Sequence, residues 1–262
     1  MQYSMLEVRC AAHVATVTLN RPDVRNAFNE TTIAELTDAF RQLDVRDDVR
    51  AIVLAANGPA FCAGADLNWM KKMATFSDEE NRVDARCLAD MLSAIYHVSK
   101  PVVARVSGDA FAGGVGLVAA SDIVVAVDTA RFCLSEARLG LIAATIAPYV
   151  IRALGERASR RYFTTAEPFD AATASRLGLV HEVVAADALD TRIGKITAAL
   201  CANGPQAVRE SKRLVQDVAG RVLDETLIDE TARRIARIRA SEEGREGVAS
   251  FLEKRAPVWA AH

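Results

Sequence analysis

A pair of glycines follows a buried strand in the stretch from Lys100 to Asp122 and opens a short apolar helix. The β-branched run Val102–Val106 is typical of a buried strand, and the small apolar residues of Val115–Ala120 are typical of a buried helix. Because Gly113 and Gly114 carry no side chain, the first backbone N–H groups of that helix are left uncovered. Such a helix start can hold a group that is negatively charged or becoming so.

The stretch Phe61–Leu67 has the same layout. It follows the apolar run Ala51–Ala55 and the turn Asn57–Pro59, and its small residues also lead into a helix. Two strand ends that each expose backbone N–H groups can direct two donors at one oxygen atom. This arrangement is an oxyanion hole, which stabilises charge that develops on a carbonyl oxygen.

Two other interpretations of the glycines compete with this one. The pattern Gly114-x-Gly116-x-x-Ala119 loosely matches a dinucleotide-binding fingerprint, but the helix can run only from about Gly113 to Ser121. A parallel crossover needs about a dozen residues, so we expect no nicotinamide or flavin site. An isolated glycine pair would more simply permit close packing, and the second, matching stretch favours the oxyanion hole.

Glu136 is the candidate for moving protons. It ends the strand predicted for Arg131–Ser135, in an otherwise apolar neighbourhood. Burial of such a carboxyl group would raise its pKa toward the working range of a general acid or base. The alternative is an ion pair with Arg131 or Arg138 on the protein surface, and the residue types alone favour that alternative.

The surrounding sequence predicts the elements that position these residues. The expected strands are Leu6–Arg9, His13–Leu19, Arg50–Ala55, Val102–Val106, Ile123–Val127, Arg131–Ser135 and His181–Val184. The expected helices are Glu30–Val45, a short one within 60–73, one capped by Ser77 that runs through Val98, Gly113–Ser121, one within 137–154, Glu156–Thr165, Ala171–Leu177 and four in the tail from 185 to 255. Ser107–Asp109 is predicted as a turn, His13 is expected to be a surface strand residue, and His181 is expected to be structural. Alternating strands and helices followed by a helical end predict an α/β fold with a helical C-terminal segment.

Composition excludes several classes of protein. The chain of 262 residues is 51% hydrophobic and has a formal net charge of −2, with both charge signs mixed along it. No basic block indicates nucleic acid, and the apolar runs fall short of the ~20 residues of a membrane span. The first residues have neither a signal nor a transit layout. Five scattered cysteines fit a reducing cytosol better than a disulfide framework, and the absence of a Cys/His cluster argues against a metal site.

The ordered motifs resemble the crotonase superfamily, the enoyl-CoA hydratases and isomerases. The matching segments are 19–22, 26–29, 61–67, 100–122, 132–140, 166–180 and 251–255. The resemblance implies a spiral core of repeated ββα units over residues 1–200. It also implies that the helices of residues 201–262 assemble homotrimers, often paired into hexamers. Residues 64–70 and 132–136 more narrowly resemble bacterial hydratases of branched, carboxylated enoyl-CoAs, the methylglutaconyl-CoA and carboxygeranoyl-CoA type.

The resemblance also assigns catalytic roles. The backbone N–H groups of Ala65 and Gly113 match the family's oxyanion donors, and Glu136 matches its second catalytic glutamate. The first catalytic glutamate of many hydratases falls on Gly116, where no carboxylate can act. Residues 141–148, LIAATIAP, also lack the Pro-Gly-rich turn that relatives commonly have there. The chain therefore departs from the two-glutamate pattern.

Coenzyme A is implied as part of the substrate, with no separate cofactor. The substrate- and CoA-binding residues implied by the resemblance are Arg25, Ala27, Ala63, Asp66, Leu67, Trp69, Phe251 and Lys254. Arg25 matches a basic position near the pyrophosphate. Phe251 and Lys254 match residues that reach the CoA site of an adjacent subunit. For Arg25 and Lys254, solvated surface charge is an equal alternative. Trp69, with Met70 and Met73, either lines the acyl pocket or packs at helical spacing.

Three functions fit one glutamate. The first is a hydratase in which Glu136 handles the water proton and the α proton in turn. The second is an enoyl-CoA isomerase, which needs one base to shuttle a proton. The third is a non-catalytic CoA-binding oligomer. The narrower resemblance favours a cytoplasmic hydratase of a branched, carboxylated 2-enoyl-CoA such as methylglutaconyl-CoA, in leucine or fatty acid metabolism.

Overall fold

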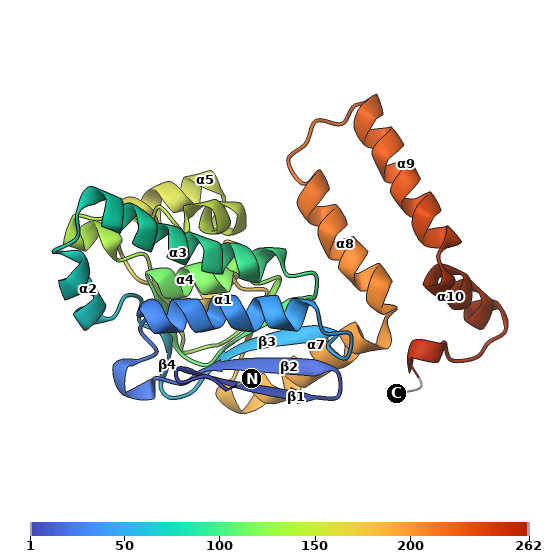
Figure 1. Cartoon of the computed structure of the whole chain (residues 1–262), viewed down its shortest axis with the longest axis horizontal. Coiled ribbons are helices and arrows are strands. Elements are labelled where there is room, and N and C mark those ends of the chain that lie inside the picture. The colour runs from blue at the N-terminus through green and yellow to red at the C-terminus, as the bar shows by residue number, and fades with distance from the viewer. Residues whose placement is uncertain (1, 261–262) are drawn as a thin grey trace.

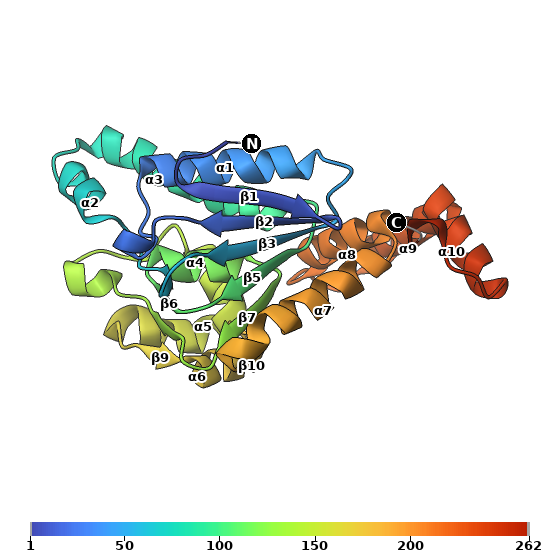
Figure 2. The same ribbon diagram turned by 90° about the horizontal axis from the view of Figure 1, so that it is seen from below.

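The computed structural model describes residues 2–260 and has two sheets of different size with helices packed around them (Figures 1 and 2). The larger sheet has six strands in the order β1-β2-β3-β5-β7-β10, namely β1 (Leu6–Ala11), β2 (Val14–Leu19), β3 (Ala51–Ala56), β5 (Val102–Val106), β7 (Ile123–Val127) and β10 (Glu182–Val184). The smaller sheet has four strands in the order β4-β6-β8-β9, namely β4 (Ala60–Cys62), β6 (Asp109–Phe111), β8 (Arg131–Cys133) and β9 (Phe169–Asp170).

Strand β3 lies near the middle of the larger sheet, between β2 and β5. All six of its residues are buried. Its pairing with both neighbours is parallel, with Leu54 opposite Val17 on one side and Ala104 on the other. A short run that is apolar throughout is typical of a parallel strand covered on both faces. Only β1 and β2 form an antiparallel hairpin in this sheet.

Each of three long strands is followed directly by a short strand of the smaller sheet. Strand β3 leads into β4, β5 into β6, and β7 into β8, and helical segments follow each pair. This repeated strand–strand–helix order confirms the predicted spiral α/β fold. Strands β4, β6 and β9 were not predicted, because runs of two or three residues are too short to show a period. The last residue of the turn predicted at Ser107–Asp109 is therefore the first residue of β6.

Helices cover both sides of the larger sheet (Figure 2). They are α1 (Glu30–Asp44), α2 (Leu67–Met73), α3 (Asp78–His97), α4 (Gly113–Ala120), α5 (Ala147–Thr165), α6 (Ala171–Arg176) and α7 (Leu189–Ala202). The predicted Ser77 cap is confirmed and forms a capping box with Glu80, and at the start of α1 the Asn29 side chain accepts from the Thr32 N–H. Gly155, at φ 75° and ψ 161°, interrupts α5. That break separates the two helices that the sequence predicts there.

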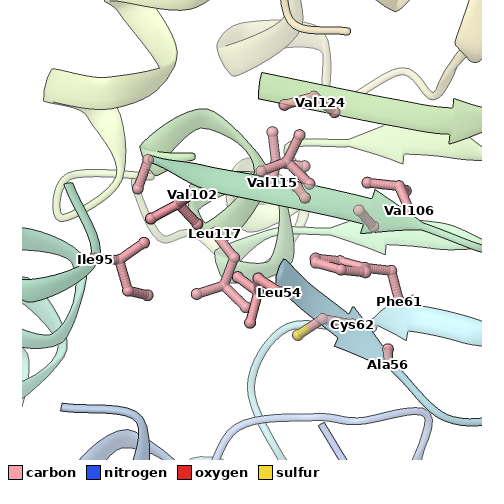
Figure 3. Close-up of a cluster of buried hydrophobic side chains, with 14 of the residues drawn as sticks. Leu54, Ala56, Phe61, Cys62, Ile95, Val102, Val106, Val115, Leu117 and Val124 are labelled. Carbon is pink, nitrogen blue, oxygen red and sulfur yellow. The ribbon is translucent and has the colours of Figure 1, made fainter. Parts of the chain in front are cut away.

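The apolar core fills the space between the two sheets and α4 (Figure 3). Leu54 and Val102 of the larger sheet, Phe61 of the smaller sheet and Leu117 of α4 are all fully buried. Because α4 is small and apolar on every face, it can be enclosed by protein on all sides. The core therefore fixes the start of α4, which carries Gly113, against the ends of β4 and β6.

Three further helices extend away from the two sheets (Figure 1). We call them the C-terminal arm; they are α8 (Pro205–Val218), α9 (Glu225–Ala240) and α10 (Glu242–Leu252). The predicted boundary after residue 200 falls within α7, shortly before the arm, and the division into two parts remains a prediction. None of the helices in residues 2–260 has both the length and the apolar character needed to cross a membrane.

Polar contacts fasten the arm to the rest of the chain. Lys212 of α8 donates to the Asp122 carboxylate at 2.6 Å and to the Lys100 carbonyl at 3.1 Å. Asp122 also accepts from the Val102 N–H at 2.7 Å, so this carboxylate links α8 to the start of β5. Gln216 donates to the Tyr96 carbonyl at 2.7 Å.

Of two histidines, His13 was expected on a surface strand and His181 was expected to be structural. His181 is: its Nδ1 accepts from the Val124 N–H at 3.0 Å and joins the chain before β10 to β7. His13 was placed in a strand, which is wrong. It lies in the turn between β1 and β2, where Ala12 and His13 have φ 47° and 62°. Two successive residues with positive φ are typical of a tight hairpin turn.

Candidate active site

Ala65 is held so that its N–H group points away from the neighbouring chain. On one side of it the Phe28 N–H donates to the Gly64 carbonyl at 2.7 Å, and on the other the Asp66 N–H donates to the Phe28 carbonyl at 2.7 Å. N–H groups alternate in direction along an extended chain, so that of Ala65 faces away from Phe28. Within residues 2–260 it has no hydrogen-bond acceptor.

Gly113 brings a second N–H group to the same place. It is the first residue of α4, and its N–H has no acceptor among residues 2–260. The two loops touch, because a Cβ atom on Gly64 would lie 2.9 Å from the Ala112 Cβ and 3.8 Å from the Gly113 nitrogen. The structure thus brings the two predicted donors together on adjoining loops.

The glycines of this region are required by close packing. A Cβ atom on Gly113 would lie 2.7 Å from Cε2 of Phe28, and one on Gly114 would lie 2.5 Å from the Cys62 carbonyl oxygen. Both separations are shorter than real contacts of a Cβ atom. Close packing and the oxyanion hole were treated as alternatives; the structure confirms the close packing, which does not exclude the oxyanion hole, and the oxyanion hole stays a prediction.

The backbone before Gly113 is strained. Ala112 has φ 48° and ψ −120°, a conformation that a residue with a Cβ rarely adopts. Its N–H donates to the Cys133 carbonyl at 2.8 Å, which ties it to the end of β8. This hydrogen bond holds the turn that aims the Gly113 N–H.

The Asp66 side chain holds the loop that carries Ala65 in place. Its carboxylate accepts from the Asn68 N–H at 2.8 Å as the cap of α2, and from Arg21 at 2.9 Å. Arg21 in turn donates to the Ala27 carbonyl at 2.6 Å. These contacts lower the pKa of Asp66 even though burial acts in the opposite direction. The carboxylate is therefore occupied within the fold, and the predicted contact of Asp66 with the substrate would have to use its backbone.

Glu136 follows β8 and begins a short 3₁₀ turn, Glu136–Leu139. The same strand carries Cys133, whose carbonyl binds Ala112 beside Gly113, so Glu136 is on the loop next to the donors. Its Oε2 atom is buried and has no hydrogen-bond partner among residues 2–260. Burial raises the pKa of this carboxyl above its ordinary value.

The surface ion pair that the residue types favoured for Glu136 is wrong. Arg131 pairs with Asp109 at 2.7 Å, and Arg138 donates to the Ala166 carbonyl. Both arginines are thus engaged elsewhere. A half-buried carboxylate with a free oxygen is suited to accept and donate protons.

Gly116 has no room for a side chain. A Cβ atom there would lie 2.3 Å from Cγ2 of Ile146 and 2.9 Å from its Cβ. The position that the resemblance gives to a first catalytic glutamate is therefore filled by an aliphatic side chain.

The remaining predicted residues form two groups. Arg25, Ala27, Ala63 and Leu67 lie on the loops around Ala65: the Ala63 N–H donates to the Arg25 carbonyl at 3.0 Å, and Leu67 begins α2. Arg25 is exposed and in the left-handed region, at φ 53°. Trp69 is buried, and its indole N–H donates to Asp84 at 3.1 Å. This contact favours packing for Trp69, one of its two interpretations.

Phe251 and Lys254 are far along the chain from these loops, at the end of α10. Phe251 is 81% exposed, and Lys254 is exposed. The arm that carries them extends away from the two sheets of the same chain (Figure 1). One described chain does not bring them to Ala65 and Gly113, so their role at the CoA site of an adjacent subunit stays a prediction.

Sequence reasoning missed three residues that shape the site. Phe28 brackets Ala65, Arg21 holds Asp66, and Ile146 fills the space at Gly116. Arg21 and Phe28 belong to motifs that carried the resemblance, and this was a signal for both. Ile146 gave no signal, because its partner is thirty positions earlier in the sequence.

A separate groove of about 790 Å³ lies between α1 and the α2–α3 region. Its lining is apolar at Ile33, Phe76 and Val83 and acidic at Glu79 and Asp84. Neither the donor loops nor Glu136 contributes to it. The groove is therefore distinct from the candidate active site.

Comparisons with known proteins show the family and fold of the chain. A family model described as enoyl-CoA hydratase/isomerase matches residues 9–262. The crystal structure of an enoyl-CoA hydratase from Shewanella pealeana superposes with a TM-score of 0.96 at 43% identity, covering 98% of this chain and 97% of that one. An enoyl-CoA hydratase from Mycobacterium smegmatis gives 0.92 at 37% identity, covering 98% and 99%. The mevalonyl-coenzyme A hydratase of Aspergillus fumigatus is 32% identical over 94% of this chain and 91% of its own length.

Proposed function

The chain belongs to the enoyl-CoA hydratase/isomerase family, and we propose that it adds water across the 2,3 double bond of a 2-enoyl-CoA. The observation that carries this proposal is the buried, unpartnered Oε2 of Glu136 next to two loops with free N–H groups. Hydration needs donors for the thioester oxygen and a carboxylate that moves protons. The candidate site offers both.

The proposed reaction uses Glu136 for two proton transfers. The carboxylate removes a proton from water while the water oxygen bonds to the β carbon. The electron pair of the double bond moves toward the thioester, whose oxygen becomes negative and is bound by the Ala65 and Gly113 N–H groups. Glu136 then returns the proton to the α carbon, so that water is added in full and the carboxylate is regenerated. Its raised pKa favours this exchange because the protonated form becomes accessible.

We propose a branched, carboxylated acyl group as the substrate, with methylglutaconyl-CoA as the leading candidate. The narrower sequence resemblance supports this choice, as does the lack of a second carboxylate at Gly116. A relative of 32% identity is named for mevalonyl-CoA, whose acyl group is also branched. A role in leucine degradation and a cytoplasmic location remain predictions.

We also propose that copies of the chain associate, as a trimer or a pair of trimers. The support is the arm, which exposes Phe251 at 81% and Leu252 at 72%. Association would bring Phe251 and Lys254 to the CoA of a neighbouring subunit. There Lys254, like Arg25, would meet phosphate groups with its positive charge.

Isomerisation is the second candidate function. It is favoured by one observation, the filling of the Gly116 position by Ile146, which leaves Glu136 as the carboxylate at this site among the described residues. One base suffices, because it can remove a proton from the α carbon of a 3-enoyl-CoA and return it to the γ carbon as the double bond moves to the 2,3 position. Appearance of the conjugated enoyl thioester from a 3-enoyl-CoA would support this function.

Hydratase assays with wild type and Glu136→Gln test the proposal directly. Crotonyl-CoA, methylglutaconyl-CoA and carboxygeranoyl-CoA are incubated with each protein, and loss of absorbance of the conjugated thioester is followed. Turnover that is lost in the variant supports hydration by Glu136. If wild type binds CoA but turns over none of the three, nor a 3-enoyl-CoA, the proposal is wrong and the non-catalytic alternative stands.

A further inference from the structure

Ile146 and Gly116 form a steric pair between α4 and the segment that leads from Glu136 into α5. The space that a Cβ atom would need at Gly116 is taken by Cγ2 and Cβ of Ile146, at 2.3 and 2.9 Å. Leu92 Cδ2 lies on a further side, at 3.5 Å. Ile146 is 1% exposed, so it cannot turn outward without leaving a cavity. Not even alanine fits at Gly116 unless Ile146 moves.

The pair belongs to the two segments that carry the predicted reacting groups. Gly116 is one helical turn after Gly113 in α4, so the two residues share a face of the helix. Ile146 is on the segment that starts at Glu136, and the Leu141 N–H donates to the Glu136 carbonyl at 3.1 Å. One segment thus supplies both the carboxyl group and the aliphatic side chain that packs on α4.

We propose that the Gly116–Ile146 pair determines substrate specificity by keeping a second ionisable side chain out of the site. The inference rests on the proposed hydratase function and deepens it. Two like charges a few ångströms apart repel each other, most strongly where water is excluded. A second enzyme carboxylate would repel an acyl group that carries its own carboxylate near the double bond. An aliphatic wall does not repel it, and it can pack against a branch.

The steric half of the inference is tested without any substrate. Thermal unfolding is measured for wild type, Gly116→Ala, Ile146→Gly and the double variant. Overpacking by Gly116→Ala should lower Tm by about 3–8 °C in wild type and by much less when Ile146 is absent. Gly194→Ala in α7, where a Cβ meets nothing within 4 Å, is the control and should not lower Tm. An equal loss in both backgrounds overturns the steric pair.

The specificity half compares two variants that differ only in charge. Ile146→Gly makes room, and Gly116→Glu or Gly116→Gln is added to it. Hydration of methylglutaconyl-CoA and of uncharged crotonyl-CoA is measured for both variants. The ratio of kcat/KM, carboxylated over uncharged, should be at least about tenfold lower with glutamate than with glutamine. An unchanged ratio overturns the inference.

The same experiment separates this inference from the proposed function. If wild type hydrates crotonyl-CoA as well as methylglutaconyl-CoA, the hydratase assignment stands and the specificity inference is wrong. If wild type hydrates neither, the proposed function fails and the specificity inference fails with it, whereas the unfolding data still decide the steric pair.

If the double variants do not fold, Ile146→Glu and Ile146→Gln repeat the charge comparison at the other member of the pair. The same difference in the ratio of kcat/KM is expected.

Discussion

Helices α1 and α9 have nearly the same length but opposite surroundings. Of the 15 residues of α1, six are buried, whereas of the 16 residues of α9 only Leu227 is buried. Both have one apolar face, and in α9 that face includes Ile228 and Ile235, which are 47% and 48% exposed. The face of α1 is covered by its own chain, and that of α9 is not. The core around the site is therefore complete within one chain, and the arm has an apolar face that suits a second copy.

This difference predicts that changes in the core alter the chemistry of each chain, whereas changes in the arm alter its attachment and association.

The largest effect is expected at Glu136. Glu136→Gln keeps the shape but removes the carboxylate that accepts and returns the proton, so kcat should fall by about 10³-fold. The absorbance assay measures it, and Tm and oligomeric state should not change. Glu225→Gln, on the exposed start of α9, is the matched control. A Glu136→Gln variant that keeps more than a tenth of the wild-type activity would contradict the catalytic role of Glu136.

The next largest effect is expected at Gly113. Gly113→Ala places a Cβ atom 2.7 Å from the Phe28 ring and displaces the donor N–H, so kcat should fall by about 10²-fold. The drop should appear in kcat more than in KM, because the donor binds charge that develops in the transition state. Gly194→Ala should leave both parameters unchanged. A drop confined to KM would show that the loop binds substrate without stabilising the oxyanion.

A change at the junction of core and arm should affect stability. Lys212→Met leaves the half-buried Asp122 carboxylate without its partner and should lower the free energy of unfolding by about 2 kcal/mol, since the carboxylate keeps some contact with water. Denaturant unfolding measures this, and adding Asp122→Asn should restore part of the loss. Arg213→Met, which breaks an exposed contact of 3.6 Å to Asp217, is the control. Equal losses would mean that Lys212 does not anchor the arm.

A change on the arm should weaken association and leave the fold of the single chain intact. Phe251→Ser removes a ring that is 81% exposed in one chain, so the stability of the single chain should stay the same. If that ring is buried between copies, the dissociation constant of the assembly should rise by roughly tenfold. Analytical ultracentrifugation over a dilution series measures it. An unchanged constant would leave the face of α9, with Ile228 and Ile235, as the contact to vary next.

The smallest expected effect is a shift of the acidic limb of the pH–activity profile to higher pH. Burial raises the pKa of Glu136, and the proposed reaction starts from its carboxylate form. Activity should therefore be lost as pH falls through a value above 4.5, the ordinary value of a glutamate. The pH profile of kcat/KM measures it for wild type. A limb at or below 4.5 would place the titrating group elsewhere.

Long elements could be predicted from the sequence because their signals are local. The capping box of Ser77 and the apolar run of Val102–Val106 each lie within one element, and both were confirmed. Strands β4, β6 and β9 have two or three residues, and only their neighbours in the sheet make them strands. Short elements of this kind depend on tertiary contacts that no local period reveals.

The site was predicted in part for the same reason. The two small-residue loops are visible in the sequence, and the structure places them against each other. The true partner of Arg131 is Asp109 on a neighbouring strand, so residue types near Glu136 suggested an ion pair that does not form. The contact between Ile146 and Gly116 depends on how α5 packs on α4, and spacing alone could not reveal it.

The parallel pairing of β10 with β7 sets an order of events during synthesis. The last strand of the larger sheet, Glu182–Val184, pairs with Val125–Val127, and the chain between them holds Glu136 and Ile146. Such distant pairing forms slowly because a long loop must close first. On the ribosome, the sheet can therefore be completed only after β10 has emerged, and the arm follows it. Each chain can close the loops of Ala65 and Gly113 before the arm has been made.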